Sequence, residues 1–409
     1  MPRQFKRQLI PLADRGPLRV MFAITSMPVG GAETLLVDLI RRLDRAHFAP
    51  ELCCLKELGP LGEVVAREIP AFDRLLGHKL DLRVLPRLTR LMRRRRIDAL
   101  VTVGAGDKMF WGRLAARLAG VPVVCSALHS TGWPDSVGRL NRLLTPITDA
   151  YIAVAAAHGK FLIEQLHFPA KKVRVVPNGI DVERFRREAD RAATRASLGL
   201  TPTTPVVGIV AALRPEKNHV LLLQAARTVR ARVPEVVFLI VGNGPERARL
   251  EILAQQLGVD KAVRFLGTRG DIPQLLSALD VFVLTSRIEA NPVSILEAMA
   301  VGRPVVAPNV GSISESVLDG VTGYVTEPNA VEPVAERLIE LLEKPQLART
   351  FGAAGQRVVE QTGSLDSMVA GYQQLISEIY TLKSDRQQAN SLRSSARTTT
   401  VDAAYADFT

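Results

Sequence analysis

Hydrophobic residues in this chain gather in short, nearly continuous runs, and most runs are followed by a stretch in which apolar side chains recur every three or four positions. The runs are typical of buried strands and the stretches of amphipathic helices. In the first half, strands are expected at residues 19–24, 51–55, 99–103, 122–125, 151–154 and 173–176, and the helices include 32–43 and 84–94. This alternation predicts a mostly parallel, doubly wound α/β sheet.

A second alternating series begins after residue 205. The expected strands are 206–211, 236–241, 263–266, 281–284 and 305–307, and the expected helices are 220–232, 247–257, 273–279, 293–301 and 333–342. The charged stretch 181–205 ends in TPTTP and is predicted to connect the two series. We therefore expect two facing Rossmann-like domains, with ligands bound beyond the carboxyl ends of their strands.

The predicted organisation has five parts. A basic N-terminal tail covers residues 1–17, the first domain covers 18–190 and the second covers 200–364. An amphipathic helix over 365–383 follows. The last stretch, 384–409, is polar and aperiodic, and we expect it to be disordered.

The composition narrows the class of protein. A chain of 409 residues is too long for one ordinary core, and its 47% of apolar residues excludes a mostly disordered protein. Its three cysteines form neither a disulfide framework nor a metal-binding spacing, and the basic N-terminus lacks the apolar core of a signal peptide. No apolar stretch reaches the length of a membrane span. A cytoplasmic location is expected, either free or peripheral at the inner face of the membrane.

The net charge of +12 favours anionic partners. Arginines fill positions 93–96, and they could either contact an acidic membrane or form the solvated end of a helix. Basic stretches at the N-terminus, at 83–96 and at 139–142 lie in the first domain, where they could dock it on an anionic membrane surface. Aromatic residues make up only 5% and do not alternate with basic ones, so no nucleic-acid partner is expected.

The segment SRIEANPVSILEAMAVGRPVVA, residues 286–307, carries the strongest candidate chemistry. Asn291 is suited to an N-cap and Pro292 to the first helical position. The helix start would then present the N–H groups of Val293 and Ser294 to an anion.

Within this segment, Glu297 is the only charged residue between Glu289 and Arg303. Its helix is otherwise almost wholly apolar, so the carboxylate should be buried and should have a partner. A ribose diol would satisfy it by donating two hydroxyl groups. The alternatives are a structural ion pair and a solvated position at the helix edge.

Two further candidates follow predicted strands. Arg214 and Lys217 lie in LRPEKNH and could neutralise a leaving diphosphate, although both could also be exposed loop cations. Gly30 and Gly31 lie in MPVGGAETLL and permit close backbone approach at a helix start, which is again an anion site. The pattern is not GxGxxG, so the dinucleotide fingerprint is absent.

A polar loop, CSALHSTGWPD, brings His129 together with Ser130 and Trp133. We consider His129 a candidate for catalysis, and a structural or exposed histidine is the alternative. Gly242, in the turn GNGPE, follows another strand and is notable mainly for its position. The chain contains no Asp-x-Asp, Gly-x-Ser-x-Gly or Walker A pattern, so neither a metal nor another cofactor is expected.

The ordered pieces GGAETLL, VPNGID, LRPEKNH and GNGP, and above all Glu289 and Glu297 spaced as E-x7-E, resemble the family 4 retaining glycosyltransferases, which have the GT-B fold. The resemblance runs from about residue 19 to residue 382. It departs from the family pattern at Ala212, where an arginine is common, at Ala290, where glycine is common, and at residues 155–157, where alanines replace a serine.

The resemblance implies a role for each candidate. Lys217 and a nearby arginine, which Arg214 would supply, bind the donor diphosphate, and Gly31 approaches it from the other domain. Glu297 holds the ribose, and Glu289 lies beside the transferred sugar. The backbone of residues 291–293 and Gly242 also contribute to donor binding. The remaining implied residues line the reacting centre and acceptor side, namely His129, Gly30, Ser130 and Trp133.

It also implies that the last helix crosses back to the first domain, that no metal is needed, and that the anomeric configuration is retained. The function expected is transfer of a sugar from a nucleotide-sugar, with UDP favoured over GDP, to a glycan or lipid-linked acceptor in cell-envelope or extracellular polysaccharide synthesis. One alternative is another enzyme on the same fold, either a nucleotide-sugar epimerase or a phosphorylase, although the chain is too short for a phosphorylase. The other alternative is a non-catalytic protein that binds a sugar-nucleotide or a glycan.

Overall fold

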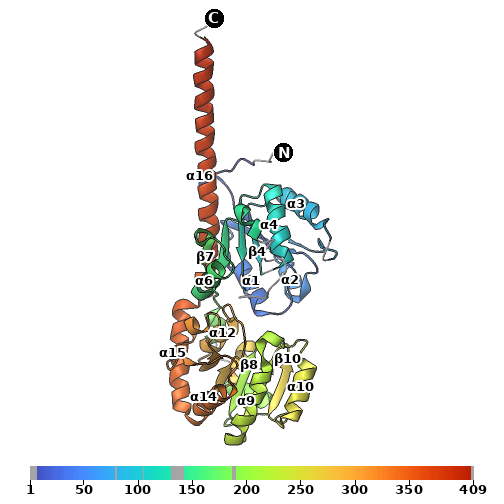
Figure 1. Cartoon of the computed structure of the whole chain (residues 1–409), viewed down its shortest axis with the longest axis vertical. Helices are drawn as coiled ribbons and strands as arrows, with labels where there is room; N and C mark the ends of the chain where they lie inside the picture. The colour runs from blue at the N-terminus through green and yellow to red at the C-terminus, as the bar shows by residue number, and fades with distance from the viewer. Residues whose placement is uncertain (1–6, 79–80, 105, 130–141, 187–189, 407–409) are drawn as a thin grey trace.

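The computed structural model describes residues 7–78, 81–104, 106–129, 142–186 and 190–406, without the side chains of 107–109 and 392–406. Figure 1 shows two α/β bodies placed end to end along the long axis, with a long C-terminal helix running beside the first. All paired strands within the two sheets are parallel. The predicted fold class, two facing Rossmann-like domains, is confirmed.

The first sheet has the strand order β3-β2-β1-β4-β5-β6-β7. Its strands are β1 (Leu18–Ile24), β2 (Phe48–Cys54), β3 (Ala71–Phe72), β4 (Ala99–Val103), β5 (Val123–Ala127), β6 (Ala150–Ala153) and β7 (Val173–Val175). Its helices are α1 (Gly31–Arg42), α2 (Gly59–Val65), α3 (Val84–Arg95), α4 (Asp107–Ala119) and α6 (Ala156–Glu164), with short 3-10 turns at Leu12–Asp14, Thr145–Ile147 and Ala170–Lys172.

Both faces of this sheet are covered, which explains the continuous apolar runs in its strands. Successive side chains of a strand point to opposite faces. In β1, Phe22 enters the core shared with α1 and the C-terminal helix, whereas its neighbour Met21 enters the core shared with α3 and α4.

The second sheet has the order β10-β9-β8-β11-β12-β13. Its strands are β8 (Val206–Val210), β9 (Val237–Val241), β10 (Val263–Gly267), β11 (Val281–Val283), β12 (Val305–Pro308) and β13 (Gly323–Thr326). The helices that accompany it are α8 (Arg191–Ser197), α9 (His219–Arg232), α10 (Arg247–Gln256), α11 (Ile272–Ala278), α12 (Val293–Ala300), α13 (Ile313–Ser316), α14 (Val331–Glu343) and α15 (Pro345–Thr362), with a 3-10 turn η4 at Pro215–Lys217.

Several elements were absent from the sequence prediction. Strand β3 has only two residues, and β13 is a four-residue run directly after a glycine turn, so neither shows a clear period. The stretch 181–205, expected to be a plain connection, contains two helices, α7 (Val182–Arg186) and α8. Helix α8 packs on the second body because Arg195, only 2% exposed, donates to the Asp280 carboxylate at 2.9 Å and to nearby carbonyl groups.

The chain crosses between the bodies at residues 178–182 and again at 363–365. The two crossings are hydrogen-bonded to each other, since Ile180 N–H donates to the Gly363 carbonyl at 2.8 Å and Leu365 N–H donates to the Ile180 carbonyl at 2.9 Å. Residue 179 must be glycine because a Cβ there would collide with the Ser364 carbonyl. The crossings are therefore one joined segment rather than two separate linkers.

The final helix, α16 (Leu365–Ala406), returns to the first body as predicted. Its apolar residues Met368, Tyr372 and Ile376 join the core formed by β1 and α1. The expected disorder of residues 384–409 is wrong for the described part, because the helix continues to Ala406 and projects beyond the first body (Figure 1). No glycine or proline lies between Gly371 and Ala406, so no helix-breaking residue interrupts this part of the helix.

The N-terminal segment is anchored on α16. The Leu9 N–H donates to the Gln387 side chain at 2.7 Å, and the Tyr380 hydroxyl donates to the Ile10 carbonyl at 3.0 Å. Arg15 pairs with the buried Asp98 at 2.6 Å. Residues 7–17 are thus packed against the first body, and the sequence pattern contained no sign of this.

Candidate active site

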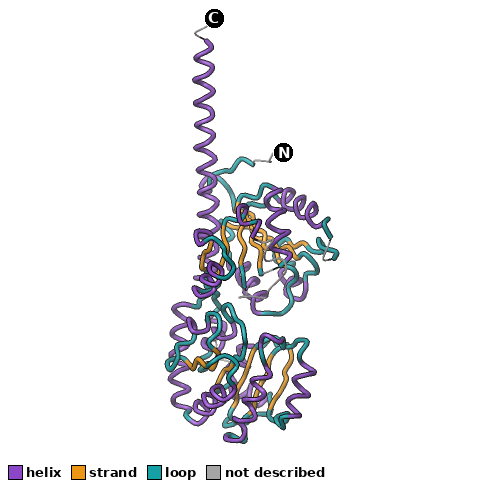
Figure 2. Tube along the Cα trace, viewed as in Figure 1, coloured by secondary structure: helices purple, strands orange, loops and turns teal. Residues whose placement is uncertain are grey.

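Some of the predicted site residues lie in loops that leave the carboxyl ends of strands, with Gly31 after β1, Lys217 after β8 and Glu289 after β11. Figure 2 shows loops in the region where the two bodies meet. Helix α1 starts at Gly31 and helix α12 starts at Val293, and a Cβ placed on Gly31 would lie 3.7 Å from the Val293 side chain. Two helix N-termini from different bodies therefore face the same small region. The N–H groups of a first helical turn lack acceptors within the helix, so this region is suited to an anion.

Lys217 and Glu289 form the central ion pair of the site. The Lys217 Nζ lies 2.6 Å from Glu289 Oε1, and the Glu289 residue is only 8% exposed. Their loops are tied together by the Thr285 hydroxyl, which donates to the Lys217 carbonyl at 3.0 Å. Lys217 is therefore held in place by its partner, in contrast to the free loop cation that the sequence left open.

Glu297 lies on the face of α12 that looks toward the first body. Burial raises the pKa of its carboxyl to about 7, the positive charge of Arg184 lowers it, and the negative charge of Asp38 raises it. The side chain keeps some solvent contact although its surroundings are mostly protein. The sequence predicted a buried carboxylate at this position, whereas the structure has it half-buried with a raised pKa.

The neighbours of Glu297 were missed by the sequence interpretation. Asp38 comes from α1 of the first body, and burial raises its pKa while Arg184 lowers it. Arg184 comes from α7, in the segment after the first chain crossing. Only the tertiary structure brings these three charges together, because 259 positions separate the first from the last.

The prediction that Asn291 caps α12 is wrong. The N-cap position is Pro292, without a side-chain cap bond, and the helix starts at Val293. The Asn291 side chain instead donates from Nδ2 to the Val154 carbonyl of the first body at 2.7 Å. A contact across the boundary has displaced the local cap that the sequence favours.

Two polar atoms of this segment have no hydrogen-bond partner within the described part of the protein. They are the Ser286 hydroxyl oxygen and Asn291 Oδ1, and both are buried. Buried polar atoms in native proteins normally have a partner. The pair therefore indicates that a polar ligand or water completes the segment between β11 and α12.

The other predicted residues are less tightly held. Arg214 is exposed and occupies the N-cap position of η4, at the end of the loop that follows β8. Gly242 has a φ of 138°, and a Cβ there would collide with the Ala211 carbonyl, so its glycine requirement has a steric cause.

His129 is half-buried just after β5, whereas Ser130 and Trp133 lie outside the described residues. At Gly30, a Cβ would collide with the Glu33 carboxylate, which folds back over the start of α1. Lys217, Glu289, Gly31 and Val293 are therefore assembled at the boundary, while the acceptor side remains a prediction.

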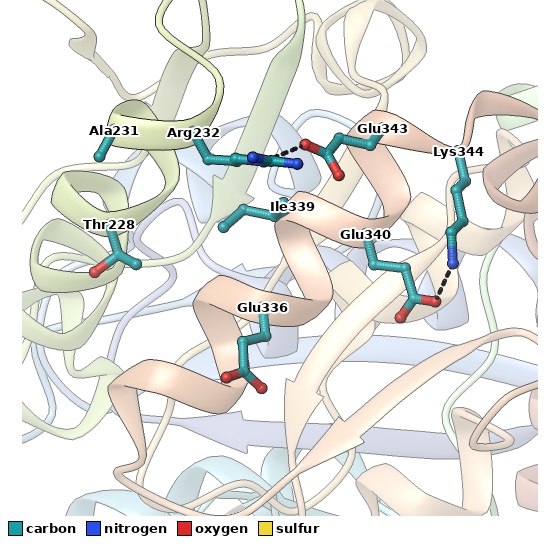
Figure 3. Close-up of a pocket in the computed structure, with 8 residues that line it drawn as sticks. All are labelled: Thr228, Ala231, Arg232, Glu336, Ile339, Glu340, Glu343 and Lys344. Atoms are coloured by element: carbon teal, nitrogen blue, oxygen red, sulfur yellow. Dashed lines mark hydrogen bonds and ion pairs between the residues drawn. The ribbon is translucent and has the colours of Figure 1, made fainter.

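A surface groove of about 570 Å³ lies elsewhere, between α9 and α14 (Figure 3). Its charged side chains are largely paired with one another, with Arg232 at 2.7 Å from Glu343 and Lys344 at 3.0 Å from Glu340. None of the predicted site residues lines it. Glu336, the one lining charge without an ion pair among the described residues, is exposed, so the groove offers no buried unpaired group that would argue for a ligand.

No helix in the described part of the chain has an apolar stretch that could traverse a bilayer.

Comparison with known proteins identifies the family. The family model described as Glycosyl transferases group 1 matches residues 190–358, and the model described as Glycosyltransferase Family 4 matches residues 29–184. The chain is 32% identical over 330 residues, covering 74% of itself and 85% of the relative, to the GDP-mannose-dependent monoacylated alpha-(1-6)-phosphatidylinositol monomannoside mannosyltransferase of Corynebacterium glutamicum.

A second relative is the UDP-Gal:alpha-D-GlcNAc-diphosphoundecaprenol alpha-1,3-galactosyltransferase of Escherichia coli, which is 29% identical over 335 residues, covering 78% of this chain and 86% of that protein. Among solved structures, HepE from Anabaena in complex with UDP-glucose superposes with a TM-score of 0.76 at 25% identity, covering 88% of this chain and 98% of that one. With these relatives and its two parallel sheets, the chain belongs to glycosyltransferase family 4, has the GT-B fold, and is a glycosyltransferase that uses a nucleotide-sugar donor.

Proposed function

We propose that this enzyme transfers a hexosyl group, with retention of configuration and without a metal ion, from a UDP-sugar to a hydroxyl of a lipid-linked glycan. The observation that supports it most is the Lys217–Glu289 pair beside the facing starts of α1 and α12. The Escherichia coli relative is named for a UDP-sugar and a diphosphoundecaprenol acceptor. The Corynebacterium relative is named for GDP-mannose, so GDP-sugars are the first alternative donors to test.

In this proposal, the donor diphosphate lies against the starts of α1 and α12, beside Gly31 and Val293. The free N–H groups of the first turn of α12 and the Lys217 ammonium group bind its oxygens, with Arg214 approaching from the exposed side. Glu297 accepts hydrogen bonds from the ribose hydroxyls. Glu289 keeps Lys217 oriented and lies beside the transferred sugar.

Departure of the sugar breaks the bond between its anomeric carbon and the phosphate oxygen, and negative charge develops on the diphosphate. Cationic and N–H groups aimed at that charge lower the barrier. The acceptor hydroxyl then attacks from the same face and gives its proton to the departing phosphate oxygen. His129 lines the reacting centre with Ser130, Trp133 and Gly30 on the acceptor side. Cell-envelope or extracellular polysaccharide synthesis, at the inner face of the membrane, is the process that this chemistry serves.

The central experiment measures nucleoside diphosphate release from a panel of UDP-, GDP- and ADP-sugars, in the presence of a chelator. We expect release from a UDP-sugar, and we expect Lys217→Ala to lower kcat by about 10²- to 10³-fold because charge on the leaving group loses its partner. Lys261→Ala, at an exposed position of the same body, is the matched control. Donor binding without any release would instead indicate a non-catalytic binding protein.

Glu297→Gln should stabilise the free protein while weakening donor binding. The folded-state pKa of about 7 lies above the ordinary 4.5, so ionisation destabilises the fold as pH rises from 4.5 through 7. Replacing the carboxyl should therefore raise the free energy of unfolding by up to about 3 kcal/mol at pH 8 and by little at pH 4.5.

Urea unfolding at the two pH values measures the stability effect, and calorimetric titration with UDP measures binding, which we expect to weaken by about tenfold or more because an amide oxygen replaces a carboxylate. A variant that is less stable at pH 8 would show that burial is not the source of the raised pKa.

Gly31→Ala should leave the fold intact and raise the donor KM by about tenfold or more. The new methyl group would make only ordinary contact with Val293 at 3.7 Å, so the protein itself has room for it. A diphosphate bound against Gly31 would, however, collide with that methyl group. Gly16→Ala, where a Cβ meets nothing within 4 Å, is the control. An unchanged KM would place the diphosphate away from α1.

The first body should bind anionic membranes through α3. Arg90 and Arg94 are exposed, lie one turn apart and make no ion pair with other described residues. Leu82, just before the start of α3, is 69% exposed. We expect sedimentation with phosphatidylglycerol-containing vesicles, but not with pure phosphatidylcholine, and a loss of at least about tenfold in affinity for Arg90→Glu/Arg94→Glu. The control is Arg349→Glu/Arg357→Glu on α15. Equal binding by both variants would contradict docking through α3.

A further inference from the structure

The start of helix α6 in the first body is capped by a side chain of the second body. Ala155 occupies the N-cap position and has no side-chain oxygen to accept from the first turn. Glu315 of α13 supplies the acceptors instead, with Oε2 at 3.0 Å from the Ala156 nitrogen and Oε1 at 2.5 Å from the Ala157 nitrogen. The free energy of capping this helix is therefore available only while the two bodies remain in contact.

The same turn is held on its other side by a pair of asparagines. Asn291 Nδ2 donates to the Val154 carbonyl at 2.7 Å, and Asn178 Nδ2 donates to the Asn291 carbonyl at 2.9 Å. Asn178 is only 5% exposed. The turn from β6 to α6 is thus bound through both its carbonyl and its N–H groups, and two separate loops of the second body provide the partners.

These two loops are joined to each other inside the second body. The Ser312 hydroxyl, just before α13, donates to the Ala290 carbonyl, and Gly311 lies so close to the Glu289 carbonyl that a Cβ there would collide with it. Displacement of α13 would therefore displace the loop that carries Glu289. The cap at Glu315 is mechanically connected to the ion pair of the candidate site.

We infer that Glu315, Asn291 and Asn178 form an interdomain clasp that positions the donor-binding loop. Glu315 acts as a positioning residue: its capping of α6 holds Val293 opposite Gly31, so the binding-competent arrangement is more populated when the clasp is intact. The inference rests on the proposed placement of the donor beside Gly31 and Val293. The clasp itself, however, can be tested without any donor.

The first test measures the separation of the two bodies directly. Spin labels are attached at Glu63→Cys in the first body and Lys261→Cys in the second, since both positions are exposed and the native cysteines 53, 54 and 125 are buried. Pulsed electron resonance of the ligand-free protein should give one main distance. Glu315→Ala should add a population with a different separation, whereas Glu332→Ala, a carboxylate in the first turn of α14, should not. An unchanged distribution in Glu315→Ala would overturn the clasp.

The second test separates positioning from simple helix capping. Glu315→Ala should raise the donor KM by about tenfold, equivalent to about 1.4 kcal/mol, with little change in kcat. Ala155→Ser adds a local cap to α6 within the first body. The double variant Ala155→Ser/Glu315→Ala should regain thermal stability but retain the raised KM.

Recovery of both stability and KM in the double variant would show that Glu315 is only a helix cap, and the inference would then fail. Asn178→Ala provides an independent check, because it should shift the spin-label distances in the same direction as Glu315→Ala. If the distances shift but Gly31→Ala leaves the donor KM unchanged, the clasp stands and the proposed donor placement is wrong.

Discussion

Two helix N-termini from different bodies meet at Gly31 and Val293, and the rest of the site is arranged around that contact. Each helix follows a strand of an open parallel sheet, so each body delivers its loops to the same boundary. The contact requires a residue without a side chain at position 31 if a ligand is to enter between the helices. It also accounts for the neighbouring charges, because first-turn N–H groups and a lysine create a region that favours a diphosphate.

The charged groups at this boundary are not all paired with opposite charges within the free protein. Lys217 is neutralised by Glu289 at 2.6 Å, but Glu297 shares its surroundings with Asp38, another acid whose pKa is raised by burial. Holding two acids close together in a poorly solvated region destabilises the free enzyme. Functional sites commonly carry such a cost, and bound hydroxyl groups would offset it.

The boundary is also held together by contacts that do not touch the proposed donor. The two chain crossings are hydrogen-bonded to each other at Ile180 and Leu365, and α16 fastens the second crossing to the first body. Glu315 and the asparagine pair connect the bodies on the turn that precedes α6. The joined crossings and the proposed clasp are the two sets of contacts between the bodies that lie outside the proposed donor position.

The sequence by itself determined the two parallel sheets, because continuous apolar runs separated by amphipathic stretches have few other solutions. It singled out Lys217 by its position after a strand, Glu297 by its isolation in an apolar helix, and Glu289 with Glu297 by the E-x7-E spacing that resembles the family. It could not determine which side chains meet across the boundary. Asp38 lies far along the chain from Asn178 and Arg184, and all three lie far from α12, so their importance depends on distance in space. Asn291 shows the physical reason: its local preference is to cap α12, but the Val154 carbonyl of the other body offers a buried partner that the isolated segment lacks. Local propensity determined where the helices and strands form, and tertiary contacts determined which partners the residues at their ends bind.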